Sequence, residues 1–196
     1  KITEQIEFKK IDILDFNSLK EVISNSDGVF HQAALTSVPE SFTQKEKYHN
    51  VNVKGTENIF KLAKEFGKKV VYASSSSIYG NTTIIPIQEN FEKNPINPYG
   101  VTKLDDEKLA EKYHNLGVSI IGLRYFNVYG IGQTNDYAGV ITKFIDQINL
   151  NKSPIIFGDG SHTRDFISVE DVAKANLLSM ESNIDFSFLN VGTGIS

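Results

Sequence analysis

The stretch VSIIGLRYF, residues 118–126, decides the fold class. It is an apolar run in which hydrophobic and polar positions do not alternate. A strand of a parallel sheet is covered on both faces, and it therefore reads as a continuous hydrophobic run. The stretch follows a helical pattern over 98–116 that ends at Gly117. It predicts a strand in a parallel sheet, preceded by a helix.

Short β-rich runs and longer helical patterns alternate on both sides of this stretch. We expect further strands at 6–13, 27–33, 68–74 and 186–192, with an apolar segment at 154–157. We expect further helices at 17–25 (capped by Asn17 or Ser18), at 45–66, near 139–149, and after the capping-box-like pair Ser168 and Asp171. This alternation predicts an α/β fold with a doubly wound parallel sheet.

Composition excludes several classes of protein. The chain has 196 residues, of which 40% are hydrophobic, and this suits one domain with a core or one domain and part of another. A formal net charge of −4 offers no basic surface for nucleic acid. The lack of cysteine excludes a disulfide scaffold and a thiolate metal site, and we predict no metal. With neither a membrane-length apolar run nor a visible signal peptide, we expect a cytoplasmic protein.

Polar or small residues follow the expected strands. Parallel sheets bind ligands at the carboxyl ends of their strands, so these segments should lie along one edge. They are Asp12, the segment 31–34, the four serines Ser74 to Ser77, and the segment that begins at Asn127.

Tyr99 and Lys103 are the pair that points to chemistry at this edge. Positions i and i+4 of a helix share a face. A cation beside a phenol favours the phenolate, so a tyrosine in this position can act as a base. A serine after the strand at 68–74 could meet the phenol there. The alternatives are that Tyr99 and Lys103 are ordinary surface residues and that the serines form a loop with local hydrogen bonds.

Seven blocks in this order carry a resemblance to a known family. They are DILD, VFHQAA, NVKGTENIFKLA, VYASSSSIYG, YGVTK, LRYFNVYG and GDGSHTRDFISVEDVA. The set resembles the extended short-chain dehydrogenase/reductases, and within them the NAD-dependent nucleotide-sugar 4-epimerases of the UDP-glucose and UDP-N-acetylglucosamine kind. The resemblance covers nearly the whole chain. It implies NAD as cofactor, a UDP-sugar as substrate, and a homodimer packed through the helices at 45–66 and 98–116.

The resemblance also implies a role for individual residues. Tyr99 matches the base that takes the proton of the sugar 4-hydroxyl, and Lys103 matches the lysine that holds the nicotinamide ribose. Ser75 matches the catalytic Ser/Thr, with Ser76 as second choice. The remaining cofactor-side matches are Asp12, Ile13, Ala33, Ala34 and Asn52. The remaining substrate-side matches are Asn127, Val140, Lys143, Phe144, Phe157 and Arg164.

Each assignment has a structural alternative. Asp12 could cap a turn, and Arg164 could pair with Asp165 or Glu170. Phe144 and Phe157 could belong to the core. We interpret His31 as a packed, hydrogen-bonded residue without a chemical role.

The chain departs from the family pattern at its start. It contains neither GxGxxG nor GxxGxxG, and the residue expected to bind the adenine ribose is missing with that turn. We therefore interpret 1–134 as a partial NAD-binding domain of Rossmann type and 135–196 as a partial substrate-binding region interleaved with it. The first residues are polar and include no methionine, so we expect the chain to begin in mid-protein and to bind NAD poorly alone.

The positions after Ser75 help to choose between reactions. Related sugar dehydratases carry Asp-Glu there, because elimination needs an acid and a base, and related decarboxylases keep a glutamate nearby. Here Ser76 and Ser77 occupy those positions, which favours 4-epimerisation through a 4-keto sugar. The open alternatives are UDP-glucuronate epimerisation, dehydration, decarboxylation, and a non-catalytic module that senses NAD or a nucleotide sugar.

Overall fold

The computed structural model describes residues 6–133, 139–156 and 158–195. Within these ranges a parallel sheet has the strand order β1–β2–β3–β6, formed by β1 (Gly28–His31), β2 (Lys69–Ser75), β3 (Ile120–Tyr125) and β6 (Phe186–Val191). A second parallel pair joins β4 (Asn127–Tyr129) to β5 (Phe166–Ser168). The predicted α/β fold with a parallel, doubly wound sheet is confirmed.

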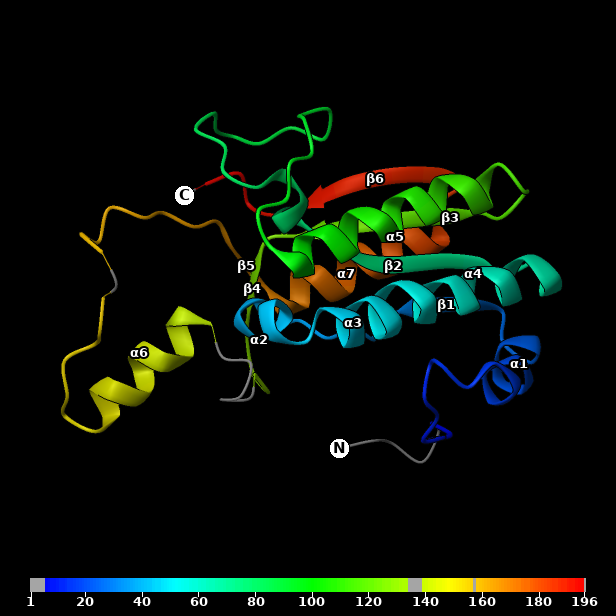
Figure 1. Ribbon diagram of the computed structural model, residues 1–196, viewed down its shortest axis with the longest axis horizontal. Helices are drawn as coiled ribbons and strands as arrows, with labels where there is room; N and C mark the ends of the chain where they lie inside the picture. The colour runs from blue at the N-terminus through cyan, green and yellow to red at the C-terminus, as the bar shows by residue number, and fades with distance from the viewer. Residues whose placement is uncertain (1–5, 134–138, 157, 196) are drawn as a thin grey trace.

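Helices cover both faces of the main sheet (Figure 1). On one face lie α4 (Gly55–Phe66) and α5 (Pro98–His114), and on the other lies α7 (Val169–Glu181). The remaining helical segments are α1 (Phe16–Ser24), α2 (Val38–Thr43), α3 (Lys45–Tyr48), the π-helical η1 (His49–Lys54), the 3₁₀ turn η2 (Ser76–Tyr79) and α6 (Val140–Asn149). Across the described ranges, every helix is too short or too polar to traverse a lipid bilayer.

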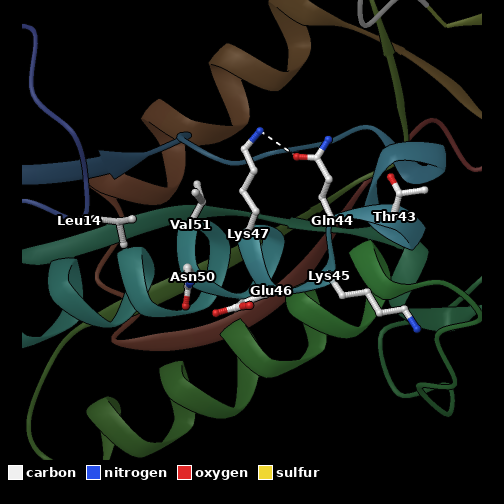
Figure 2. Close-up of a pocket in the computed structure, with 8 residues that line it drawn as sticks. All are labelled: Leu14, Thr43, Gln44, Lys45, Glu46, Lys47, Asn50 and Val51. Atoms are coloured by element: carbon white, nitrogen blue, oxygen red, sulfur yellow. Dashed lines mark hydrogen bonds between the residues drawn. The ribbon is translucent and has the colours of Figure 1, made fainter.

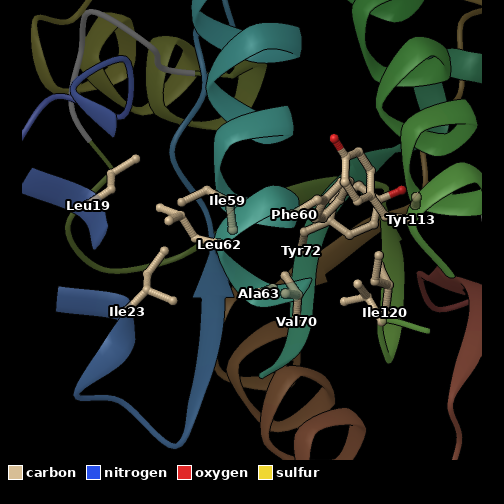
Figure 3. Packing of buried hydrophobic residues seen from close by; sticks show 12 residues of the cluster. Leu19, Ile23, Ile59, Phe60, Leu62, Ala63, Val70, Tyr72, Tyr113 and Ile120 are labelled. Atoms are coloured by element: carbon tan, nitrogen blue, oxygen red, sulfur yellow. The ribbon is translucent and has the colours of Figure 1, made fainter. Parts of the chain in front are cut away.

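The central strand β3 explains why its sequence does not alternate. Ile120 belongs to the apolar cluster beneath α4 and α5, whereas its neighbour Ile121 belongs to the cluster beneath α7. Both side chains are fully buried. Figure 3 shows the first cluster, in which Phe60 of α4 packs edge-on against Tyr72 of β2. Both faces of β3 are covered by hydrophobic clusters, so its sequence does not alternate between apolar and polar residues.

Several local predictions need correction. Residues 6–13 form no strand, because strand order ends at β1 and no described strand lies beside the segment to pair with its backbone. The cap of α1 is Asp15, which accepts from the Ser18 amide, and neither Asn17 nor Ser18 fills that position. The helix predicted over 45–66 is interrupted by η1, although it ends at Gly67 as expected, with φ of 63°. Residues 154–156 form no strand.

A buried ion pair joins α5 to the sheet. Arg124 of β3 donates from Nε and Nη2 to the two carboxylate oxygens of Glu107, at 2.8 Å each. The Ser74 hydroxyl of β2 donates to the same carboxylate at 2.7 Å. Arg124 Nη1 also donates to the Tyr79 hydroxyl and to the Glu89 carbonyl oxygen. One carboxylate therefore links three elements in a place that water does not reach.

We expect Arg124→Met to lower the free energy of unfolding by about 3–5 kcal/mol, because it leaves the Glu107 carboxylate buried without a cation. Urea denaturation measures this change. Lys108→Met breaks an exposed pair with Asp105 and serves as the control, with an expected cost below about 1 kcal/mol. Equal effects of the two substitutions would contradict the prediction.

Candidate functional site

The helix that carries Tyr99 and Lys103 is capped and anchored at its first turn. Asn97 accepts from the Gly100 amide at 2.8 Å, and Pro98 occupies the first helical position. The Tyr99 amide donates to the hydroxyl of Ser41, a fully buried residue of α2, at 3.2 Å. The Tyr99 backbone is therefore held from two directions, while its side chain stays partly exposed.

Close packing brings this helix to the serine segment after β2. A Cβ at Gly100 would lie 2.8 Å from the Ser77 carbonyl oxygen, so only glycine permits this approach. Ser75 ends β2 and is buried, and its Oγ accepts from the Ser77 amide at 3.2 Å. That contact uses a lone pair of Ser75 Oγ and leaves the hydroxyl proton for another acceptor. Ser76, at the start of η2, is partly exposed.

Lys103 points inward and is only 3% exposed. Its ammonium donates to the Ala73 carbonyl oxygen at 3.1 Å and to Asp106 Oδ2 at 3.2 Å. Burial lowers the pKa of Lys103, but the Asp106 carboxylate and the phenols of Tyr99 and Tyr125 more than offset this, so its pKa is raised. The ammonium therefore stays charged inside the protein, close to the Tyr99 phenol.

His31, at the end of β1, is buried near Lys103. Its Nε2 lies 2.8 Å from the Thr56 hydroxyl, and that hydroxyl donates its proton to the Asn52 carbonyl oxygen. Burial, with a smaller contribution from the Lys103 ammonium, lowers the pKa of His31 to about 3. His31 is therefore neutral at physiological pH, in keeping with our interpretation of it as a packed, hydrogen-bonded residue.

The predicted cofactor-side residues fall into two groups. Ala33 and Ala34 lie exposed or half-buried in the loop after β1, where small side chains leave the backbone accessible. Asn52 is fully buried, and its amide group exchanges hydrogen bonds with the Leu35 backbone and donates to Thr102. Asn52 therefore ties the loop after β1 to α5.

Asp12 and Ile13 lie apart from this group, before α1. The Asp12 carboxylate accepts from the Leu14 amide at 2.9 Å, which is the turn-capping contact considered as an alternative. Ile13 is half-buried, and its carbonyl oxygen accepts from the Asn58 side chain. Its side chain fills the space above Gly55, at the start of α4.

Three side chains form a ring of hydrogen bonds at the edge of the sheet, and sequence patterns did not predict it. The Tyr125 hydroxyl donates to Gln32 Oε1, Gln32 Nε2 donates to Asn176 Oδ1, and Asn176 Nδ2 donates back to Tyr125, at 2.7–3.0 Å. The ring joins the ends of β1 and β3 to α7. The partners lie up to 144 residues apart, so sequence spacing carried no signal for it.

The predicted substrate-side residues are spread over a wider region. Asn127 begins β4 and donates through Nδ2 to the Asp165 carbonyl oxygen. Val140, Lys143 and Phe144 belong to α6, which has no buried residue and stands away from the main sheet (Figure 1). Phe157 lies outside the described residues.

Arg164 is exposed, and its guanidinium donates to the Thr163 carbonyl oxygen. The neighbouring Asp165 carboxylate accepts instead from Thr193 and from the Gly194 amide. Asp165 thereby anchors the loop that follows β6.

A shallow pocket of about 470 Å³ lies elsewhere, along α3 and η1 (Figure 2). Its lining includes Leu14 and Val51, and Lys47 donates across it to Gln44 at 3.0 Å. None of the predicted catalytic residues lines it. Among the described residues, no three His, Cys, Asp or Glu side chains gather closely enough to hold a metal ion. The predicted catalytic residues Ser75, Tyr99 and Lys103 belong instead to β2 and α5.

The chain is similar to known proteins over nearly its whole length. The model of the NAD dependent epimerase/dehydratase family matches residues 1–192. A putative UDP-glucose 4-epimerase of Methanocaldococcus jannaschii is 42% identical, over 98% of this chain and 64% of its own length.

Two solved structures share the fold closely. The UDP-N-acetylglucosamine 4-epimerase of Methanobrevibacter ruminantium M1, in complex with UDP-N-acetylmuramic acid, has a TM-score of 0.91 at 38% identity, covering 95% of this chain and 61% of that one. The UDP-glucuronic acid 4-epimerase of Bacillus cereus, in complex with UDP-glucuronic acid and NAD, has a TM-score of 0.88 at 31% identity, covering 97% and 61%. The chain thus spans just over 60% of the length of these proteins.

The depressed pKa of His31 predicts that this side chain makes the folded protein less stable as the pH falls. Between the folded pKa of about 3 and the ordinary value of 6.5, the unfolded chain binds one proton more than the folded chain. The contribution of His31 to the free energy of unfolding should therefore fall as the pH falls, by up to about 1.4 kcal/mol per pH unit. Asp106, whose pKa is raised to about 7, contributes in the opposite direction. Denaturant titrations at pH 6.5 and 5 should show that acidification destabilises His31→Gln less than it destabilises the unaltered protein, or stabilises it more. His49→Gln, at an exposed position, should keep the original slope; a His31→Gln slope equal to it would contradict the prediction.

Proposed function

Because this chain belongs to the NAD dependent epimerase/dehydratase family, we propose that its protein is a nucleotide-sugar 4-epimerase that acts on a UDP-hexose through a transient 4-keto sugar. The observation that carries the proposal is the set Ser75, Tyr99 and Lys103 at one sheet edge, with serines following Ser75. Elimination of water would need a carboxylic acid and a base in that position. Of the nearby carboxylates, Glu107 is buried against Arg124 and Asp106 against Lys103.

The residues of the site suit NAD. Lys103 uses two of its three N–H groups within the protein, which leaves one for a ribose hydroxyl. Ala33 and Ala34 leave the loop backbone after β1 open to a ligand. When bound, NAD supplies the acceptor and donor of hydride at the sugar C4 carbon.

The side chains of this chain then handle the proton and the orientation. Tyr99 takes the proton of the sugar 4-hydroxyl and returns it to the product. Ser75 donates its free hydroxyl proton to the same sugar oxygen. Lys103 contributes a fixed positive charge close to the Tyr99 phenol. Arg164 suits the diphosphate, since a guanidinium can bind phosphate oxygens in a bidentate manner. Asn127 offers a side-chain amide beside Asp165, the residue that follows Arg164.

A homodimer belongs to the same proposal, packed through the helical segment 45–66, which comprises α3, η1 and α4, and through α5. Val101 supports this, because it is 44% exposed on α5. Phe60 of α4 is fully buried in the core between that helix and the sheet, and it does not contribute to such a surface.

We expect Tyr99→Phe to reduce turnover by about 10²–10⁴-fold while substrate binding survives, because only the proton-accepting oxygen is lost. Steady-state rates and a binding titration on the full-length protein measure both quantities. Tyr113→Phe removes the same oxygen at the far end of α5, where the hydroxyl contacts Glu57, and should retain turnover. Unchanged turnover in Tyr99→Phe would remove Tyr99 from the mechanism.

We expect the full-length protein to interconvert a gluco- and a galacto-configured UDP-sugar. Separate incubations with UDP-glucose, UDP-N-acetylglucosamine and UDP-glucuronate, followed by NMR, identify the product and choose among the three substrates. A 4-keto-6-deoxy sugar would indicate dehydration, and a pentose would indicate decarboxylation. Binding of NAD and UDP-sugar without any product would favour the sensing module.

A further inference from the structure

We propose that Asp106 is a positioning residue of the site: its buried carboxylate orients the Lys103 ammonium and keeps it charged, so that one N–H faces the ligand. Asp106 acts through Lys103 and contacts no ligand itself. The inference deepens the proposed function, on which it rests for the role of Lys103.

The geometry around Lys103 assigns the three N–H groups of the ammonium. One donates to Ala73 of β2 and one to Asp106 Oδ2, three residues further along α5. The two contacts come from different elements, and together they restrict rotation about the end of the lysine side chain. The third N–H is the one available to a ligand oxygen. Without Asp106, the single contact with Ala73 would leave the ammonium free to rotate.

The positive charge of the buried Lys103 ammonium needs an anion nearby. An ammonium that is 3% exposed is costly unless an anion accompanies it. Glu107, the next carboxylate along α5, is committed to Arg124 by two hydrogen bonds. His31, which faces Lys103 from β1, is neutral because of its lowered pKa. Asp106 is therefore the carboxylate that balances Lys103.

Few titratable groups face the Asp106–Lys103 pair. His31 of β1 and the Tyr125 phenol of β3 face it from other elements, and the Tyr99 phenol and the Asp105 carboxylate lie near it on α5 itself. Lys103 also reaches the Ala73 carbonyl oxygen of β2. The Thr56 hydroxyl, from α4, gives its proton to the Asn52 carbonyl oxygen and has none left for Asp106.

The burial of the Asp106 carboxylate is unfavourable in itself. It is completely buried, and its Oδ1 has no hydrogen-bond partner. Burial raises the pKa of Asp106 to about 7, even though the Lys103 ammonium acts in the opposite direction. A half-satisfied buried carboxylate costs stability. The contact with Lys103 is the gain that the structure offers against this cost.

Asp106→Asn in the full-length protein removes the charge of this side chain and keeps its shape. We expect kcat/KM to fall on the order of 10²-fold, because the ammonium is no longer held in place. We also expect the alkaline limb of the pH–rate profile to move to lower pH, because Lys103 loses its proton more readily without the carboxylate. Asp27→Asn is the matched control, since Asp27 is exposed just before β1, at the end of that strand away from His31, and it should leave both quantities unchanged.

NAD affinity provides a readout that does not depend on turnover. Asp106→Asn should weaken NAD binding in the unaltered background and have no further effect in Lys103→Met, because Asp106 acts through Lys103. An equal loss in both backgrounds, or an unchanged pH profile with full activity, would overturn the inference. If the Asp106→Asn variant fails to fold, NAD affinity is measured instead for Asp106→Ser, with and without Lys103→Met. Coupling in NAD affinity together with no turnover on any UDP-sugar would refute the proposed function and leave the role of Asp106 intact.

Discussion

The bidentate ion pair between Glu107 and Arg124 is the contact on which the arrangement of the site depends. The Glu107 carboxylate joins α5 to β3, and it also accepts from Ser74 of β2. Two of these elements carry the groups proposed to meet the ligand: α5 presents Tyr99 and Lys103, and β2 ends at Ser75. A charge removed from water must keep its partner, so the pair tolerates little displacement. The position of the helix relative to the strand ends is fixed accordingly.

Beneath the sheet edge, polar side chains replace the apolar packing found elsewhere. Asn52 ties the loop after β1 to α5, and Lys103 joins α5 to the Ala73 carbonyl oxygen of β2. Hydrogen bonds in a low-dielectric interior are strong, and a network of them holds a single arrangement. The ligand-facing groups are thereby supported by neighbours that are themselves fixed, which is what a reaction sensitive to small displacements requires.

The proposed chemistry asks little of the protein beyond proton transfer and orientation, because NAD carries the hydride. This fits a site built from hydroxyls and one ammonium. The region expected to recognise the nucleotide sugar is separate: α6 has no buried residue, and Arg164 lies in an exposed segment. In the proposed site, the residues that move the proton are therefore distinct from those expected to recognise the nucleotide sugar.

The sequence by itself determined the parallel sheet, the order of most elements and the shared face of Tyr99 and Lys103, because these follow from periodicity and from spacing within one helix. It predicted the strand at 6–13 wrongly, since a strand exists only where a neighbour pairs with it. Arg124 within the apolar stretch 118–126 is visible in the sequence, but its partner is not. The Glu107–Arg124 pair and the Tyr125–Gln32–Asn176 ring were decided by tertiary structure alone. Their members lie on different elements, and only the packing of those elements determines which side chains meet.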